Sequence, residues 1–397
     1  MSSDIKLQNW RFWPVILMAF SYTINGSLIM LGIPLLFYQK GVSIEIIGLL
    51  SAAQIIAYCF SPLLFNKVSD KLGRKRSVIL SMVGVSICQI TYLFILEPIV
   101  FFIVRFTEGL FLGFFAPNLQ ASISDNPSLD HSKYLSRFSL SFNSGSLAGL
   151  LFGTLFLFFI DNILLVFYIA PLMIIANSVI AIIFFQESTQ KDETSSILNS
   201  IPTSNEVKYH IPVIIPIVIL FGFSFATGSV YFIYPIKSEI LGFPPYSTYF
   251  LSFFFSLAQT ISTYMASLWT TKRLRLMSLI SIILISLLII AFGINEYFLG
   301  FIILFVVIGL SAGVLYGSAL KFFMILNLTK QTSKYSSFME SLTGISYFTT
   351  QITAGIIGGL ALELAFFTLA IILIGIFILY LLCIKKIYII SNNKKDD

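Results

Sequence analysis

The sequence predicts an all-α membrane protein in which twelve transmembrane helices form two six-helix bundles related by a pseudo-twofold axis. Three observations lead to this fold class. Only 11% of the 397 residues are charged, whereas 57% are hydrophobic. The apolar residues fall into twelve runs that are long enough to cross a bilayer. The second half of the chain also repeats landmarks of the first half at an offset of about 200 residues.

The low charge content excludes several classes of protein. Soluble domains carry about 25% charged residues, so this chain lacks the polar surface that water requires. A nucleic-acid-binding protein, a disulfide-stapled secreted domain and a soluble two-domain enzyme are all disfavoured for this reason. The three cysteines lie within apolar runs, so we expect no disulfide, no metal site and no cofactor.

The twelve apolar runs are separated by charges, prolines, glycines or polar clusters. Their expected limits are 12–37, 44–65, 77–96, 99–122, 135–160, 162–185, 211–236, 246–269, 275–294, 297–320, 336–360 and 364–384. The only long polar segment between runs predicts a cytoplasmic linker at 186–210, between an N-terminal bundle at 1–185 and a C-terminal bundle at 211–397.

The loop charges predict the orientation of the chain. With the N-terminus in the cytoplasm, all but four of the 24 basic residues lie on the cytoplasmic side. Lys40 and Lys237 fall outside, and Arg105 and Lys321 fall within spans. This asymmetry predicts a multi-pass protein of the cell membrane with both termini in the cytoplasm, and it explains the net charge of +6 without an anionic partner.

Several landmarks of the internal repeat fall at equivalent spans. Pro34 and Gly41 align with Pro235 and Gly242, Gly109 and Gly113 align with Gly309 and Gly313, and Lys133-Tyr134 aligns with Lys334-Tyr335. Glycine and proline are common in membrane helices, so one such coincidence would mean little. Several in register indicate a duplicated six-helix unit, which is the plan of transporters that bind substrate between two bundles.

The loop after the second span carries a charged motif. It reads Asn66-Lys67-Val68-Ser69-Asp70-Lys71-Leu72-Gly73-Arg74-Lys75-Arg76 and resembles the signature loop of the major facilitator superfamily. Asn66 and Val68 depart from the usual Gly and Leu of that motif. The resemblance implies a cytoplasmic gate in which Asp70 meets the start of the span at 336–360 and Arg74 meets an acid at the end of the fourth span. Asp125 stands at that position, and Gly73 and Lys75 complete the expected gate.

The fourth span contains two charged residues, Arg105 and Glu108, in a segment that resembles a second motif of the same family. A charge in hydrocarbon costs roughly 3 kcal/mol on insertion scales, so the two must pair or face water. At a spacing of three residues they can pair along one helix face. They form either a structural ion pair or a proton site in which Glu108 binds and releases a proton beside Arg105.

Polar side chains at helical spacing line several spans. Such residues often serve only as helix-packing contacts in bilayers. Amides and tyrosines deep within spans are better candidates for substrate contacts, and the resemblance places these spans around a central cavity. The expected cavity residues are Tyr22, Asn25, Gln54, Asn143, Thr227, Tyr231, Gln259, Tyr347 and Gln351.

The motifs and the spans together predict a secondary transporter. No phosphate-binding glycine-lysine loop, metal cluster or nucleophile motif is present in the sequence, so we expect no enzymatic activity. The favoured function is proton-coupled efflux of amphipathic, drug-like compounds by a monomer acting as a drug/proton antiporter. One alternative is proton symport that imports a sugar or other metabolite, and another is a transporter-like receptor or sensor.

Overall fold

The computed structural model describes residues 11–94, 97–125, 131–187, 208–330, 334–384 and 388–390. The first half of the chain comprises α1 (Trp13–Gln39), α2 (Ile44–Leu72), α3 (Arg74–Thr91), α4 (Pro98–Leu112), α5 (Ala116–Ser124), α6 (His131–Ile160) and α7 (Leu164–Ile183). The second half comprises α8 (Ile214–Gly228), the π-helical turn η2 (Ser229–Ile233), α9 (Tyr234–Ile240), α10 (Pro245–Leu268), α11 (Thr271–Ile294), α12 (Phe298–Lys330), α13 (Lys334–Leu360) and α14 (Leu362–Ile384).

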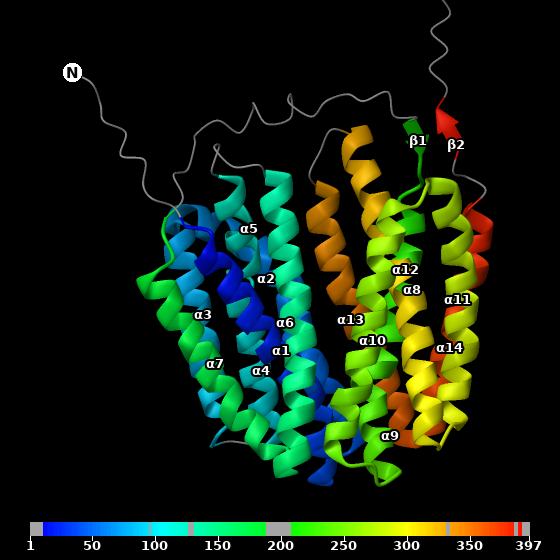
Figure 1. The fold of residues 1–397 in the computed structure, drawn as a ribbon, viewed down its shortest axis with the longest axis horizontal. Helices are drawn as coiled ribbons and strands as arrows, with labels where there is room; N and C mark the ends of the chain where they lie inside the picture. The colour runs from blue at the N-terminus through cyan, green and yellow to red at the C-terminus, as the bar shows by residue number, and fades with distance from the viewer. Residues whose placement is uncertain are drawn as a thin grey trace, which may run out of the picture.

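The helices stand side by side in two groups, with α1–α7 in one half of the molecule and α8–α14 in the other (Figure 1). Counting α4 with α5, and α8 with η2 and α9, gives the twelve expected spans. Two expected spans are interrupted. The fourth breaks around Gly113, and Pro117 lies in the first turn of the next helix. The seventh contains the π-helical turn.

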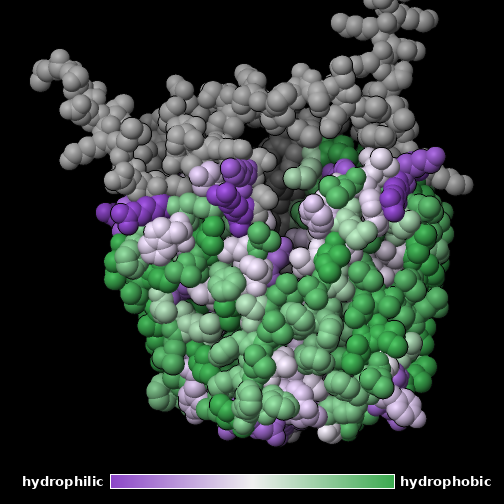
Figure 2. Space-filling model, in the orientation of Figure 1, coloured by the Kyte–Doolittle hydropathy of each residue, from purple (hydrophilic) through white to green (hydrophobic). Residues whose placement is uncertain are grey.

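Nine helical stretches in the described part of the chain are long and apolar enough to cross a membrane by length and composition. The spans outside this set are α3, α10 and α13, which carry charges or many hydroxyl groups. For α10 and α13 the polarity is explained by their place in the fold, because both pack across the boundary between the two halves. The face of the molecule seen in Figure 2 carries a broad apolar band.

The internal repeat is visible in the helix contacts of the two halves. A Cβ atom built on Gly109 of α4 would lie 2.2 Å from the Gln54 carbonyl oxygen of α2. A Cβ atom built on Gly309 of α12 would lie 2.5 Å from the Phe255 carbonyl oxygen of α10. The α2–α4 and α10–α12 pairs therefore pack through equivalent glycines.

The turns that follow the first and seventh spans repeat as well. Gly41 has φ +73° and Gly242 has φ +71°, a left-handed conformation that glycine adopts without strain. The residue after each glycine closes the helix with the same kind of hydrogen bond. Val42 N donates to Phe37 O, and Phe243 N donates to Ser238 O, each to a carbonyl five residues earlier.

The two halves meet mainly through α2 on α13 and α6 on α10. Contacts cross between the two halves at the end of the molecule where α2 and α10 begin. We call it the opposite end, because the end that carries Arg74 and Arg273 lies on the other side of the molecule. Gln39 Nε2 donates to Glu239 Oε1 at 3.0 Å, and Tyr249 Oη donates to Leu28 O at 2.6 Å. A Cβ atom built on Gly48 would lie 3.0 Å from Gly355 Cα, so the backbones of α2 and α13 nearly touch.

The other end of the molecule is where α3 and α11 begin, and we call it the basic end because it carries Arg74 and Arg273. The space-filling view shows a hollow between the two halves at this end (Figure 2). A short antiparallel pair lies beyond the second half there, formed by β1 (Lys208–His210) and β2 (Tyr388–Ile390), with Tyr209 opposite Ile389. The expected linker at 186–210 lies largely outside the described residues, and the domain boundaries stay a prediction.

Candidate functional site

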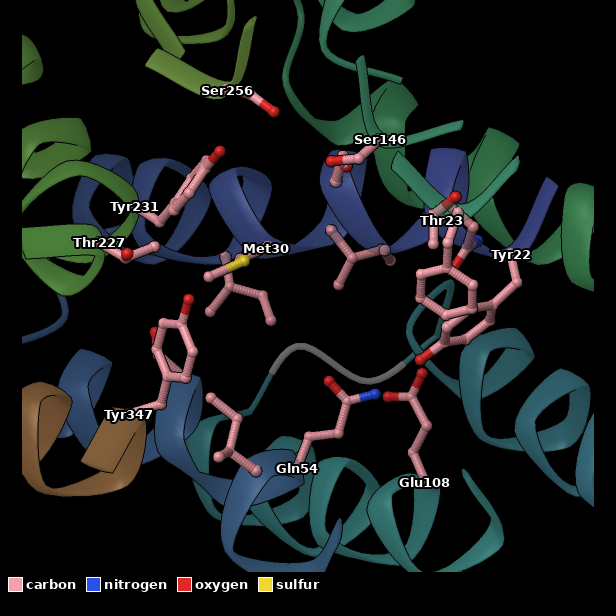
Figure 3. Close-up of a pocket in the computed structure, with 18 of the residues that line it drawn as sticks. Tyr22, Thr23, Met30, Gln54, Glu108, Ser146, Thr227, Tyr231, Ser256 and Tyr347 are labelled. Carbon is pink, nitrogen blue, oxygen red and sulfur yellow. Dashed lines mark hydrogen bonds between the residues drawn. The ribbon is translucent and has the colours of Figure 1, made fainter. Parts of the chain in front are cut away.

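A cavity of about 370 Å³ lies between the two halves. All nine expected cavity residues line it: Tyr22, Asn25, Gln54, Asn143, Thr227, Tyr231, Gln259, Tyr347 and Gln351. Arg105 and Glu108 line the same cavity. In the close-up, Glu108 lies beside Tyr22 and Gln54, and Tyr231, Thr227 and Tyr347 stand at the other end (Figure 3).

The Glu108 carboxylate is held by three donors. Arg105 Nη1 donates to Oε2 at 2.7 Å, Gln89 Nε2 donates to Oε1 at 2.8 Å, and the Tyr92 hydroxyl also donates to Oε2. The side chains of Arg105 and Glu108 are only 6% and 1% exposed. An ionised carboxylate accepts hydrogen bonds and donates none, so this geometry fits a charged Glu108.

Asn25 connects this pair to the rest of the first half. Its amide Nδ2 donates to Gln89 Oε1 at 3.0 Å and to the Ala170 carbonyl at 2.6 Å, and its Oδ1 accepts from Gln89 Nε2 at 2.9 Å. The side-chain amide of Asn25 is fully engaged within the protein. Its geometry is that of a residue that holds Gln89 against Glu108.

The wall formed by the second half contains tyrosines and amides. Tyr231 projects from η2 and interacts with Ser256 of α10, and Tyr347 of α13 interacts with Thr227 of α8. Short π-helical turns are frequent at functional sites, because they shift a side chain out of the regular helical register. Here the turn belongs to the segment that carries Tyr231 into the cavity (Figure 3).

Among the residues that the structure describes, three buried polar atoms around the cavity have no hydrogen-bond partner. They are Arg105 Nε, Ser51 Oγ and Gln351 Oε1. Buried polar atoms are almost always paired, so such exceptions call for an explanation. Because they lie on a cavity wall, these groups are open to pairing with a ligand, with water or in a second conformation.

The expected gate residues gather at the basic end. Arg74 Nε donates to Asp125 Oδ2 at 3.0 Å, and Arg74 Nη1 donates to Asp70 Oδ1 at 3.0 Å. Asn118 accepts from Ser69 Oγ at 2.5 Å and from Arg74 Nη1 at 3.4 Å. The contact expected between Asp70 and the start of the span at 336–360 stays a prediction, since the side chains of residues 334–337 lie outside the described residues.

A further acid, Glu187, also lies at the basic end and binds the start of α3. This role was not predicted from the sequence. The Glu187 carboxylate accepts from Arg74 N at 2.6 Å and from Lys75 N at 3.0 Å, and so caps the first turn of α3. Gly73 has φ +86°, and a Cβ atom built there would lie 3.0 Å from the Glu187 carboxylate. Glycine is required by both the backbone and the close approach. No sequence signal links Glu187 to this loop, because the two are far apart in the chain.

The equivalent loop of the second half is built differently. Thr270 caps α11 through its hydroxyl, which accepts from Arg273 N at 3.4 Å, and the Arg273 guanidinium lies 4.4 Å from the Trp269 ring centroid. Arg275 Nη2 of the same loop donates to the Ile384 carbonyl at 2.8 Å.

The sequence matches the family model described as Major Facilitator Superfamily over residues 15–327, which is most of the chain. The chain belongs to this superfamily. A solved structure of the nucleoside transporter NupG superposes with a TM-score of 0.71 at 12% identity, covering 94% of this chain and 99% of that one. The structure of a point mutant of NupG gives a TM-score of 0.68 at 15% identity, with the same coverage. At these identities the likeness concerns the fold.

A curated relative, the Staphyloferrin B transporter of Staphylococcus aureus, is 29% identical over 106 residues. That match spans 27% of this chain and 25% of the relative. The superfamily assignment makes this chain a multi-pass membrane protein and a secondary transporter that binds a small molecule, not an enzyme. The drug/proton antiporter subtype expected from the sequence stays a prediction.

Two residues near the cavity of this superfamily member were missed in the sequence, Gln89 and Tyr92 of the third span. Gln89 is 1% exposed and bonded to both Asn25 and Glu108, and Tyr92 is 1% exposed and bonded to Glu108. An amide in the middle of an apolar run was a usable signal for Gln89. Tyr92 gave none, because it lies at the end of its helix, where tyrosine is common.

Proposed function

We propose that this transporter couples the movement of a small organic solute to protons by alternating access. Glu108 is the proton-binding group, and the solute binds in the central cavity between Glu108 and the tyrosines of the second half. The observation that carries the proposal is the Arg105–Glu108 pair, which is almost fully buried and yet lines the cavity. An ionisable pair at such a position is expensive in a membrane, and it typically marks an ion or proton pathway.

The arrangement of the two ends supports alternating access. The basic end is hollowed, whereas hydrogen bonds join the halves at the opposite end. By the loop charges, this conformation faces the cytoplasm. We propose further that the protein works as a monomer in the cell membrane with both termini in the cytoplasm.

The cavity wall supports a solute that forms many hydrogen bonds. Amide and hydroxyl side chains line both halves, and the volume suits a small organic molecule. The names of the two relatives, a nucleoside transporter and a staphyloferrin B transporter, agree with a small organic solute.

A second candidate is the efflux of amphipathic compounds in exchange for protons. Apolar side chains on the cavity wall favour it, among them Met30, Ile33 and Phe142. In that case solute and proton would compete for the site, and solute would move against the proton.

The test is transport by the purified protein in proteoliposomes with an imposed pH gradient, using labelled neutral, cationic and anionic solutes. We expect wild type to accumulate or expel at least one solute in response to the gradient. Glu108→Gln should lose this response and keep gradient-independent exchange of the same solute. The matched control is Glu97→Gln, because Glu97 is an exposed carboxylate that caps α4 outside the cavity. Equal responses in wild type and Glu108→Gln would exclude Glu108 as the proton carrier.

A further inference from the structure

We propose that the solute is a small organic monoanion, a carboxylate on a body rich in hydroxyl or amide groups, and that it moves in the same direction as the proton. This inference rests on the proton coupling proposed above, and it adds the charge of the solute and the sense of the coupling.

The described cavity wall contains one acid and one base. Apart from tyrosines, Arg105 and Glu108 are its only ionisable side chains. The titratable groups that interact electrostatically with Glu108 are Arg105 on its own helix, Tyr22 on α1, and Cys88 and Tyr92 of the third span. From α2 comes the uncharged Gln54 (Figure 3). With Glu108 ionised the site is neutral, and with Glu108 protonated it carries one positive charge.

That positive charge needs a counter-ion. Arg105 stays protonated at any physiological pH, and an unpaired guanidinium in a site of low dielectric is costly. Its Nη1 is bonded to Glu108 and the guanidinium also interacts with Tyr92, whereas its Nε has no hydrogen-bond partner in the part of the chain that the structure describes. The guanidinium can bind a carboxylate through two parallel hydrogen bonds, so a solute carboxylate can replace Glu108 as the counter-ion.

This replacement links the solute to the proton. When the solute carboxylate takes over Arg105, Glu108 loses its strongest donor and its ionised form becomes unfavourable, so Glu108 binds a proton. The coupling is reciprocal, and protonation of Glu108 raises the affinity for the anion by the same factor. Ligands that bind together move together, and the transport is therefore symport.

The single arginine also limits the charge of the solute. A dianion such as a phosphate monoester would leave one negative charge unbalanced in the cavity. A cation would be repelled by Arg105 when Glu108 is protonated. It would therefore bind preferentially to the site in which Glu108 is ionised. A monocarboxylate matches the protonated site with no charge left over.

Other groups on the cavity wall can bind the body of the solute. Among the described residues, Gln351 Oε1 of α13 is a buried acceptor without a donor, and Ser51 Oγ of α2 has no partner. Tyr347 and Tyr231 stand at the end of the cavity away from Glu108 (Figure 3). A hydroxyl or amide group on the body of the solute would supply the missing donor.

The test measures the charge preference of the cavity with thiol reagents, so the natural solute need not be known. In full-length protein with Cys59, Cys88 and Cys383 changed to serine, Gln54→Cys places a thiol beside Glu108. The probes are the anionic sulfonatoethyl and the cationic trimethylammonioethyl methanethiosulfonates, which are similar in size. The readout is the ratio of the anionic to the cationic labelling rate, in which the ionisation of the thiol cancels. A thiol introduced at Asn143, on α6, gives a second reporter of the same cavity.

We expect the ratio to rise about tenfold as the pH falls and Glu108 gains its proton. With Glu108→Gln added, the ratio should be high at every pH. With Arg105→Gln and Glu108→Gln together, which leaves no unpaired charge, the ratio should be low at every pH. A ratio that Glu108→Gln leaves unchanged would overturn the monoanion inference.

The two proposals fail in different ways. If Glu108→Gln gives a high ratio but the wild-type ratio does not change with pH, then Glu108 takes no proton and both proton coupling and symport are overturned. If Glu108→Gln abolishes the response to a pH gradient but leaves the ratio unchanged, proton coupling stands and the anionic solute is excluded.

Discussion

The fourth span and its repeat in the second half, α12, share their packing but differ in their chemistry. Gly109 and Gly309 meet the carbonyl oxygens of the neighbouring helix in the same way. The residues that precede them differ. At the offset defined by these glycines, Arg105 corresponds to Phe305 and Glu108 corresponds to Ile308, and both apolar side chains are fully buried.

The difference teaches that helix packing in this protein was duplicated, whereas the ionisable pair occupies one half only. The wall formed by the first half carries the ionisable Arg105 and Glu108, and the wall formed by the second half offers neutral tyrosines, hydroxyls and amides. We infer a division of labour in which the first half binds the proton and the second half recognises the body of the solute.

The largest expected effect comes from removing one partner of the pair. Arg105→Phe leaves the Glu108 carboxylate buried without a counter-ion, at a cost of about 3–5 kcal/mol. Adding Glu108→Ile reproduces the residues of the second half, and most of the stability should return. Thermal unfolding of the purified variants in detergent measures both effects. A single variant as stable as wild type would show that the pair is not buried as described.

Alanine at the repeated glycines should be costly in both halves. Gly109→Ala and Gly309→Ala both place a methyl group within 2.5 Å of a backbone oxygen, and each should cost about 1–3 kcal/mol. Gly375→Ala is the control, since a Cβ atom there meets nothing within 4 Å. The same unfolding assay compares the three. A large cost for only one of the repeated glycines would argue against equivalent packing.

A conservative change on the neutral wall should affect recognition alone. Tyr347→Phe removes a hydroxyl worth about 1 kcal/mol, so solute affinity should fall about fivefold. The dependence of transport on pH should stay as in wild type. Affinity measured by exchange at several pH values checks both statements, and a changed pH dependence would contradict the proposed division between the walls.

The smallest effect is expected at the gate. Asp70 is 47% exposed and paired with Arg74, and such pairs contribute less than about 1 kcal/mol. Asp70→Asn should therefore slow transport about two- to fivefold with little change in solute affinity. Thr270→Ala in the equivalent loop of the second half is the comparison, and it should leave the rate closer to wild type. A collapse of affinity in Asp70→Asn would place this loop in the binding site.

Much of the fold could be predicted from the sequence, because lipid imposes a minimum length on every apolar run. The positions of Gly41 and Gly242 already indicated the repeat, and both adopt the same left-handed conformation. The polar residues chosen within the spans do line one cavity, since an amide in a membrane helix has few other stable positions. The π-helical turn at 229–233 gave no sequence signal, because it depends on packing between helices.

The network around Glu108 was predictable only in part. Arg105 and Glu108 are neighbours on one helix, and their spacing alone indicates a pair. Gln89, Tyr92 and Glu187 act on groups that only the tertiary structure brings near them. Their partners depend on how α3 packs against α4 and how the chain after α7 returns to the start of α3.

The central claim is that Glu108 binds and releases a proton within the cavity. Infrared difference spectroscopy of the purified protein tests it directly, because a protonated carboxyl group absorbs apart from an ionised one. Spectra of wild type and Glu108→Gln are compared across the pH range in which both stay folded. We predict that wild type gains a protonated carboxyl band on acidification that Glu108→Gln lacks. Identical difference spectra from the two proteins would contradict the account.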